Sequence, residues 1–466
     1  MKYRFFILPA ALGLASCKLG PDFQLPGASG GSKWKEGTVA AANRLPDSWW
    51  RLFNDNELNR IVARALTANN DLAAAKARVN TSRALVGVDR AKLFPTLDLA
   101  GSAGISRASG DAVRGNLPPG ATVDLESQNY RSSFDLAYEP DLWGRKIRQI
   151  EASSATAAAS EALLDSQRLG IAAEVARQYF LLRGLDDQEA VLHDTVKSRQ
   201  DALEIQKSKA DAGLIDGLSS SRARTEVELA NSDLAAIQRQ RGAAEHALAV
   251  LCGTRPSDFS ISARASSDFL PTLRAGLPAE VLNRRPDVRA AEQDLRAANA
   301  RIGVAEAAFY PKFSLTASGG LQALDVSRFL DWENRILSLG TGLVAPLIDG
   351  GTNQSNYQAA RSRYEEALAK YRQTLLIALR EVEDALVDLK GLAKSHASLA
   401  AALKSARDTR QLSQERFDNG LTSYLEVVDT DRTVLQTRLT LSQLEAQQRI
   451  TLAALAKALG GGWSGK

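Results

Sequence analysis

Few residues of this 466-residue chain are of the types and spacings that do chemistry. The three histidines, His193, His246 and His396, fall within helical stretches and lack the spacing of metal ligands. Acidic residues such as Glu381 and Glu383 alternate with arginine and lysine, which is typical of a solvated helix face. The sequence holds no glycine-rich phosphate loop, nucleophile elbow or Cys-x-x-Cys motif. It therefore predicts no enzyme activity and no metal or cofactor site.

Cys17 is the one residue placed for covalent modification. A positively charged start and an apolar run precede the small-residue site Leu14-Ala15-Ser16-Cys17, as in a signal peptide spanning residues 1–16. The cysteine at that site resembles the lipobox of bacterial lipoproteins, where it becomes the acylated first residue. The alternative is an ordinary cleaved signal. In that class of lipoproteins, a non-acidic second residue such as Lys18 implies sorting to the outer membrane.

Charge and hydropathy exclude two further classes of protein. The formal net charge is +4, and no basic block with interleaved aromatic residues occurs, which argues against nucleic-acid binding. No segment after the signal has 18 consecutive apolar residues without a charge, so the sequence predicts no transmembrane helix. A mature chain that crosses a membrane would therefore do so with strands.

The chain contains two copies of one structural unit of about 200 residues. Matching proline and glycine residues recur at an offset of about 207 residues, in the pairs Pro140 and Pro346, Gly213 and Gly420, and Gly253 and Gly460. We therefore predict a lipid-anchored N-terminal segment 17–56, a first repeat 57–253, a linker 254–277 and a second repeat 278–463.

Each repeat changes from helical to strand periodicity and back. A single opening helix is expected to end at an aromatic-proline step, Phe94-Pro95 or Tyr310-Pro311, because proline disfavours the α conformation in the residue before it. Four stretches of about ten residues then alternate apolar with small polar side chains, near residues 97–105, 130–138, 313–321 and 337–347. This pattern fits tilted strands of a membrane β-barrel, and half-buried sandwich strands are the alternative. Proline-free helical runs of about 100 Å follow, 144–213 and 350–420, and shorter helices return after them.

Four strands cannot close a barrel, and an open sheet edge in lipid leaves backbone groups without hydrogen-bond partners. Closure therefore requires several copies of the chain. Two copies would give eight strands and a lumen filled by side chains, whereas three would give twelve strands and room for water. The predicted inward face is small, polar and acidic, which favours water. The sequence thus predicts an α+β membrane protein with four strands per chain, a homotrimer whose 12-stranded β-barrel continues into a helical tunnel.

Three segments carry a resemblance to a known family. They are Gly20-Pro21-Asp22-Phe23, the run 416–429 with its Arg-Phe-Asp-Asn-Gly-Leu and Leu-Glu-Val-Val-Asp motifs, and the end Lys457-Ala458-Leu459-Gly460-Gly461-Gly462-Trp463. The chain resembles the outer-membrane efflux lipoproteins, which are the outer membrane factors of tripartite resistance-nodulation-division export pumps. The resemblance implies a trimeric duct made of a 12-stranded outer-membrane β-barrel continued by a long periplasmic α-helical barrel. It also implies that the duct is anchored to outer-membrane lipids and has no catalytic activity. It also implies two partners, a periplasmic membrane-fusion adaptor and an inner-membrane resistance-nodulation-division transporter.

The resemblance further implies a gate at the periplasmic tip. The tip is expected where the long helices turn back, at Gly213-Leu214 and Gly420-Leu421. Just after the second turn, the family pattern carries an apolar ring over to Leu425, an acidic ring to Asp429 and a second carboxylate to Glu426. Three carboxylates that converge on an axis repel one another and favour cations, so a closed gate needs positive partners.

Two arginines are candidates for that positive partner. The resemblance carries a latching cation over to Arg416, and Arg222 occupies the position of the first repeat that matches Asp429. We hypothesise that Arg222 or Arg416 pairs with Asp429. Plainer interpretations exist for this stretch, because Ser423-x-x-Glu426 is a capping box and Leu425 can equally serve in helix packing.

Two other functions fit parts of the sequence. One is an exit duct for type I protein secretion, although the lipid anchor and the Gly-Gly-Gly-Trp end favour efflux of small molecules. The other is a periplasmic coiled-coil scaffold or adhesin, which would be soluble and fully helical once its lipid is removed. We expect the gated efflux duct, with substrate selectivity lying in the pump.

Overall fold

The computed structural model describes residues 18–27, 33–36, 45–111, 124–267 and 269–461. The predicted signal peptide, Cys17 and Trp463 lie outside these residues. The chain divides into two compact units, and each takes segments from both sequence repeats. Unit 1 comprises residues 1–25, 80–158 and 293–369, and unit 2 comprises residues 26–79, 159–292 and 370–466.

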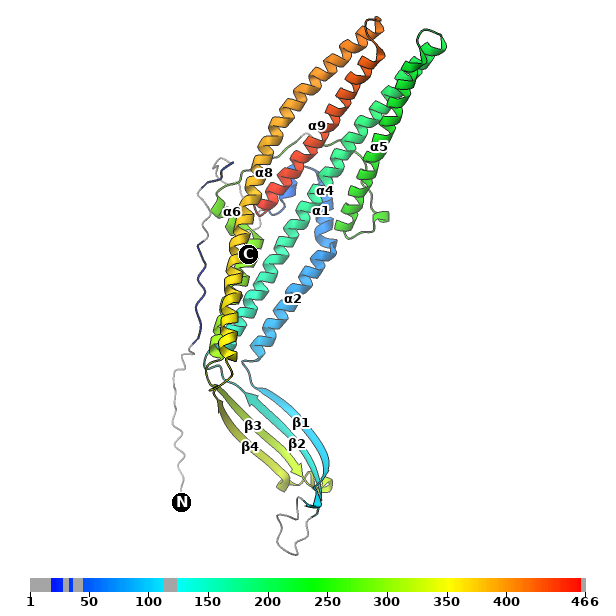
Figure 1. The fold of residues 1–466 in the computed structure, drawn as a ribbon. Coiled ribbons are helices and arrows are strands. Elements are labelled where there is room, and N and C mark those ends of the chain that lie inside the picture. Colours follow the sequence, from blue (N-terminus) through cyan, green and yellow to red (C-terminus); the bar gives the residue numbers. More distant parts are fainter. Residues whose placement is uncertain (1–17, 28–32, 37–44, 112–123, 268, 462–466) are drawn as a thin grey trace. The chain divides into compact units, whose positions relative to one another are not determined.

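Unit 1 contains one four-stranded sheet in the order β1-β2-β3-β4, in which every neighbouring pair is antiparallel (Figure 1). The strands are β1 (Thr96–Arg107), β2 (Glu126–Tyr138), β3 (Lys312–Ala323) and β4 (Arg335–Val344). The first repeat supplies β1 and β2, and the second supplies β3 and β4, as the alternating stretches predict. Within one chain, β1 and β4 are therefore the edges of the sheet.

The two faces of this sheet differ in polarity. Residues directly opposite one another on neighbouring strands share a face. One row across the sheet joins Asp98, Asp135, Ser318 and Ser338, and the adjoining row joins Leu97, Leu136, Ala317 and Leu339. Leu97 and Leu339 of the second row are largely exposed in the single chain. Strands of a barrel that separates lipid from water have this pattern.

Long helices make up most of the remaining chain (Figure 1). Each repeat contributes one helix of 67 residues, α4 (Arg145–Asp211) and α8 (Thr352–Asp418), and one returning helix of 35 residues, α5 (Gly217–Leu251) and α9 (Tyr424–Ala458). At 1.5 Å per residue, the longer helices extend for about 100 Å, as predicted. No described helix is both long and apolar enough to cross a membrane.

The opening helices differ from the prediction, because each consists of two helices rather than one. The first repeat has α1 (Asn56–Ala68) and α2 (Asn70–Ala91), and the second has α6 (Pro278–Arg284) and α7 (Pro286–Ala307). The breaks fall at Asn69 and Arg285, whose backbones are extended. Arg285 precedes a proline, which disfavours a helical residue before it. Asn69 caps α2, because its side chain accepts the backbone N–H of Leu72 at 3.1 Å.

The main hydrophobic core lies in unit 2 and joins the two repeats. Its fully buried members come from the turn Trp49–Phe53 and from α1, α4, α5, α8 and α9, and include Trp49, Leu58, Tyr179, Leu248 and Leu455. The Tyr179 hydroxyl donates a hydrogen bond to Asp55 Oδ2 at 2.7 Å. Burial raises the pKa of Tyr179 to about 12, so the phenol stays protonated. This core holds together the part of unit 2 from which α4 and α8 extend to the turns at Gly213 and Gly420.

Candidate functional site at the helix turns

The two predicted tip turns have the same backbone structure. Gly213 (φ 72°) and Gly420 (φ 70°) lie in the left-handed region that favours glycine. The N–H groups of Leu214 and Leu421 each donate to the carbonyl five residues earlier, at 2.9 and 2.8 Å. These bonds close the ends of α4 and α8 in the Schellman arrangement. Leu214 and Leu421 are 73% and 69% exposed, so each turn presents an apolar side chain.

Glu426 lies in the first turn of α9, and its carboxylate is engaged within the chain. It accepts hydrogen bonds from the Thr422 hydroxyl and from Ser413 Oγ, the latter at 3.3 Å. The hydrogen bond from Thr422, supported by the charge of Arg416, lowers the pKa of Glu426 from its ordinary 4.5. The Ser423 side chain makes no cap hydrogen bond. Glu426 therefore ties the start of α9 to α8 through Ser413.

Asp429 lies one turn further along α9 and is exposed. It forms an ion pair with Arg432, three residues on, at 3.9 Å between Oδ1 and Nη1. Leu425, on the same stretch of α9, is also exposed. In the part of a single chain that the structure describes, neither Arg222 nor Arg416 forms an ion pair with Asp429. The chain thus gathers the three candidate gate residues on the first turns of α9.

A cluster of charges near these residues was missed by sequence reasoning. It joins five residues from four helices, here called the four-helix ion cluster: Arg199 of α4, Glu226 of α5, Arg410 of α8, and Asp431 and Arg432 of α9. Asp431 lies 3.5 Å from Arg199 Nε and 3.3 Å from Arg410 Nε. Arg199 lies 3.2 Å from Glu226, which also pairs with Arg432. Sequence spacing indicates only a neighbouring contact of the cluster. Arg432, a member, follows Asp429 by three residues, which suits an ion pair along one helix.

Burial strengthens this cluster. Arg199 and Glu226 are only 7% and 5% exposed. Removing one partner of a buried ion pair leaves a charge without compensation, which costs far more than the loss of a surface pair. Arg199 Nη1 also donates to the backbone carbonyl of Glu226 at 2.9 Å. The buried pair therefore joins α4 to α5, and the partly exposed Asp431 and Arg432 attach α9 to that pair.

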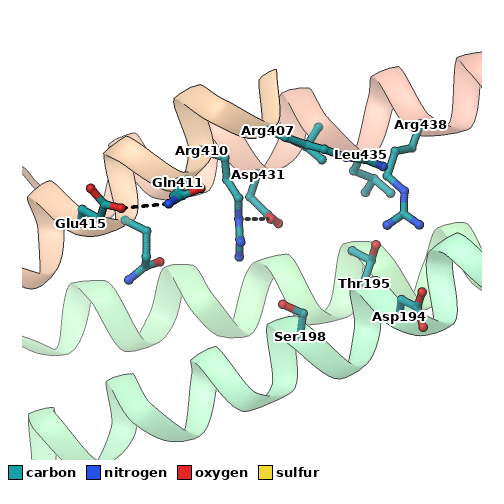
Figure 2. Close-up of a pocket in the computed structure, with 12 residues that line it drawn as sticks. Asp194, Thr195, Ser198, Arg407, Arg410, Gln411, Glu415, Asp431, Leu435 and Arg438 are labelled. Atoms are coloured by element: carbon teal, nitrogen blue, oxygen red, sulfur yellow. Dashed lines mark hydrogen bonds and ion pairs between the residues drawn. The ribbon is translucent and has the colours of Figure 1, made fainter. Parts of the chain in front are cut away.

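A polar groove of about 580 Å³ adjoins the cluster (Figure 2). Figure 2 shows Arg410 and Asp431 paired between α8 and α9, while Thr195 and Ser198 lie opposite on α4. The lining includes three arginines and three acids, which are Arg407, Arg410, Arg438, Asp194, Glu415 and Asp431. Charged side chains, rather than a packed apolar core, thus line the space between α4 and the α8–α9 pair.

Two further contacts join the first-repeat hairpin (α4–α5) to the second-repeat hairpin (α8–α9). Tyr424 packs against Leu203 of α4 and Val227 of α5, and burial raises its pKa. Lys209 Nζ of α4 lies 5.3 Å from the ring centroid of Phe417 of α8. These contacts are local, so they can break while each helix keeps its backbone hydrogen bonds. The described residues contain no group of side chains that could hold a metal ion.

Sequence comparison connects this architecture with known proteins. The chain matches the family described as Outer membrane efflux protein over residues 61–254 and 277–461. It is 32% identical to the toluene efflux pump outer membrane protein TtgI of Pseudomonas putida, over all of this chain and 99% of that protein. It is 30% identical to the cation efflux system protein CusC of Escherichia coli, over 97% of each chain.

Solved structures give the same result. The outer-membrane channel OprN has a TM-score of 0.88 and 30% sequence identity, over 96% of this chain and 100% of that chain. The open state of the MtrE outer membrane channel of Neisseria gonorrhoeae has a TM-score of 0.83 and 27% identity, over 96% and 98%. The four strands and long helices predicted from the sequence are therefore confirmed as the fold of these channels. The chain belongs to the outer membrane efflux protein family, the non-enzymatic outer-membrane channels of tripartite efflux pumps.

Proposed function

We propose that three copies of this chain form a gated efflux duct, a closed β-barrel in the outer membrane continued by an α-helical barrel in the periplasm. The observation that carries the proposal is the sheet of unit 1, which has two open edges, one polar face and one apolar face. An open edge leaves backbone groups unsatisfied in lipid, and closure by identical chains removes it. Twelve strands also leave room for water, whereas eight would be filled by side chains.

The gate lies at the helix turns. Leu425 and Asp429 of three α9 helices form an apolar and an acidic ring, and Glu426 supplies a second carboxylate. The Asp429 carboxylates repel one another near the axis. Arg432 offsets part of this repulsion within each chain, because it lies 3.9 Å from Asp429.

The latch of this gate has two parts. The first is the four-helix ion cluster, which holds the second-repeat hairpin against the first-repeat hairpin through Arg199 and Asp431. The second consists of Arg222 and Arg416, which are placed near the turns and are the candidates to pair with Asp429 in the assembled trimer. Opening then requires the second-repeat hairpin to move away from the first.

A lipid on Cys17 anchors the duct to the outer membrane. The residues that follow Cys17 are docked on unit 1, which supports an anchor held at one place. Buried Arg148 donates from Nε to the carbonyl of Leu19 at 2.8 Å and from Nη2 to the carbonyl of Gly20 at 2.7 Å. Lys18 pairs with Glu151 at 3.0 Å. Incorporation of labelled palmitate into the wild-type chain, and its loss in Cys17→Ala, would test this part of the proposal.

The partners are a periplasmic membrane-fusion adaptor and an inner-membrane resistance-nodulation-division transporter. The exposed turns at Leu214 and Leu421 are the surfaces that an adaptor would contact. The relatives TtgI and CusC carry the names of toluene and cation efflux systems. We therefore expect small molecules or ions as substrates, rather than the proteins exported by type I secretion.

Two measurements test the duct itself. The full lipid-bearing chain in mild detergent should have the mass of a trimer, and it should conduct ions in planar bilayers. A monomer that passes no current would refute the duct, and a soluble, fully helical product would favour the scaffold alternative. Deleting the gene should lower resistance to small toxic compounds. A defect confined to the export of one protein would instead point to type I secretion.

A further inference from the structure

The strands of unit 1 end at different levels on the side where they join the helices. Thr96 is the first residue of β1, and its row across the sheet runs through Ala137 and Thr316 to Gly340. β4 does not end in that row but continues from Gly340 to Val344. The end of the sheet therefore steps by four residues between β1 and β4. A closed barrel keeps the direction of this stagger all the way round.

This step determines which residues of two neighbouring copies meet. In an assembly of identical chains, β4 of one copy pairs with β1 of the next, and the two run antiparallel. Because the stagger continues in the same direction, Thr96 of the next copy lies level with Val344 or beyond it. Residues 346–348 of one copy then lie beside residues 92–95, which lead into β1 of the next copy.

Those lead-in residues border a pocket of about 510 Å³ within unit 1. Charged groups in its lining are already engaged within the chain. Lys92 lies 2.8 Å from Asp89 and Arg145 lies 2.7 Å from Glu139, while Lys146 donates to the backbone carbonyls of Lys92 and Glu139. An occupant therefore needs no charge of its own. The apolar part of the lining is formed by Phe94, Tyr138, Val304 and Leu315.

The segment that reaches this pocket is strongly apolar. Leu347 and Ile348 are 92% and 96% exposed, more than any other large apolar side chain in the described part of the chain. The edge that receives them is apolar as well, since Leu85 and Val88 of α2 and the following Phe94 are exposed. Two unpartnered apolar surfaces therefore lie at the β4 and β1 edges of the same sheet. The stagger places them opposite each other when β4 of one copy pairs with β1 of the next.

We propose that Leu347 and Ile348 of one copy insert beside Phe94 into this pocket of the next copy, so that the pocket is an inter-subunit socket completed only by a second copy of this chain. The inference rests on the proposed trimer and adds a definite contact to it. The socket also fixes the register in which β4 pairs with β1. A slip by one residue would turn every side chain to the opposite face, and it would withdraw Ile348 from Phe94.

Cysteine cross-linking tests the socket in the full lipid-bearing protein. The pair Phe94→Cys with Ile348→Cys should form disulfide-linked dimers and trimers under mild oxidation. The control pair Ile105→Cys with Ile348→Cys uses a residue at the far end of the same β1 edge and should link at least about tenfold less. Native Cys252 is buried and can remain.

A second pair of variants does not depend on disulfide geometry. Ile348→Ser should speed dissociation of the detergent-solubilised trimer by about tenfold or more, because it removes buried apolar surface from the interface. Leu330→Ser changes a comparably exposed residue outside the strands and should dissociate at the wild-type rate. An intact trimer that cross-links equally well through Ile105, or that dissociates at the wild-type rate in Ile348→Ser, would overturn the socket alone. A monomeric wild type would instead overturn the proposed function.

Discussion

Arg199 of α4 and Asp431 of α9 form an ion pair at 3.5 Å, although they belong to different sequence repeats. Asp431 also lies 3.3 Å from Arg410 of α8. One carboxylate therefore connects the second-repeat hairpin with the first-repeat hairpin close to the turns. Most side chains that line the groove beside it are polar, and apolar contacts between the hairpins lie on either side of it, as at Leu192 with Leu435 and at Leu203 with Tyr424.

Asp431→Asn is expected to open the tip. Arg199 keeps its buried partner Glu226, so loss of the partly exposed Asp431 charge costs about 1 kcal/mol, or about fivefold in the ratio of closed to open states. Single-channel conductance in planar bilayers at neutral pH should rise severalfold. Asp233→Asn makes the same change of charge on an exposed face of α5 and should conduct like the wild type. An equal rise in both variants would attribute the effect to net charge rather than to this pair.

Asp429→Ala is expected to raise conductance and to lower the preference for cations. A ring of three carboxylates favours cations in the pore, so its removal should move the reversal potential in a salt gradient toward zero. The variant also frees Arg432 from its contact at 3.9 Å. Unchanged conductance together with unchanged selectivity would exclude Asp429 from the gate.

The closed tip should weaken in acid through Glu426. The hydrogen bond from Thr422 lowers the pKa of Glu426 from its ordinary 4.5. A carboxyl whose pKa is lowered stabilises the folded arrangement above that ordinary value, and this stabilisation is lost as the pH falls through the lowered pKa. Conductance should therefore be constant from pH 7 to about pH 5 and should rise below 4.5.

Two variants separate Glu426 from the other carboxylates that titrate in acid. Glu426→Gln should lack the part of the acid step that belongs to this residue. Thr422→Val should bring the remaining step closer to the ordinary pKa, because the hydrogen bond that lowers it is gone. A step of undiminished size in Glu426→Gln would assign the acid response to other groups.

Gly303→Val is expected to release the segment that follows Cys17. A Cβ at Gly303 would lie 2.6 Å from the carbonyl oxygen of Leu19 and 2.9 Å from Arg148 Nε, which is too close for the docked segment to stay. Trypsin should then cut the purified protein after Lys18 at least about tenfold faster. Gly87→Val lies in α2 of the same unit, and its added Cβ would meet no atom within 4 Å. If both variants are cut equally fast, the segment is not held at Gly303.

The fold could be predicted from sequence wherever one residue type controls the local backbone. Gly213 and Gly420 end the long helices because they adopt positive φ, and the alternation of side chains locates all four strands. The opening helices were predicted as single helices, and this was wrong. Their breaks involve only Asn69 and Arg285, and a break of one residue hardly disturbs the helical pattern on either side.

The candidate site could be predicted only in part. Leu425, Glu426 and Asp429 share one short stretch, so a family motif points to all three, and their role in gating stays a prediction. Arg199, Glu226 and Asp431 come from three helices, and their meeting depends on how those helices rotate and pack. No local sequence pattern indicates that rotation, so the four-helix ion cluster can be identified only from the structure.

The equal lengths of the paired helices restrict how this chain can diverge. α4 and α8 each contain 67 residues, and α5 and α9 each contain 35. One inserted residue would rotate everything after it by about 100° and would carry Asp431 away from Arg199. An insertion in a single repeat would also make the six long helices of the proposed tunnel, α4 and α8 of each copy, unequal in length. Evolution is therefore expected to leave these helix lengths alone and to add or delete residues in the connections, such as the one between β1 and β2.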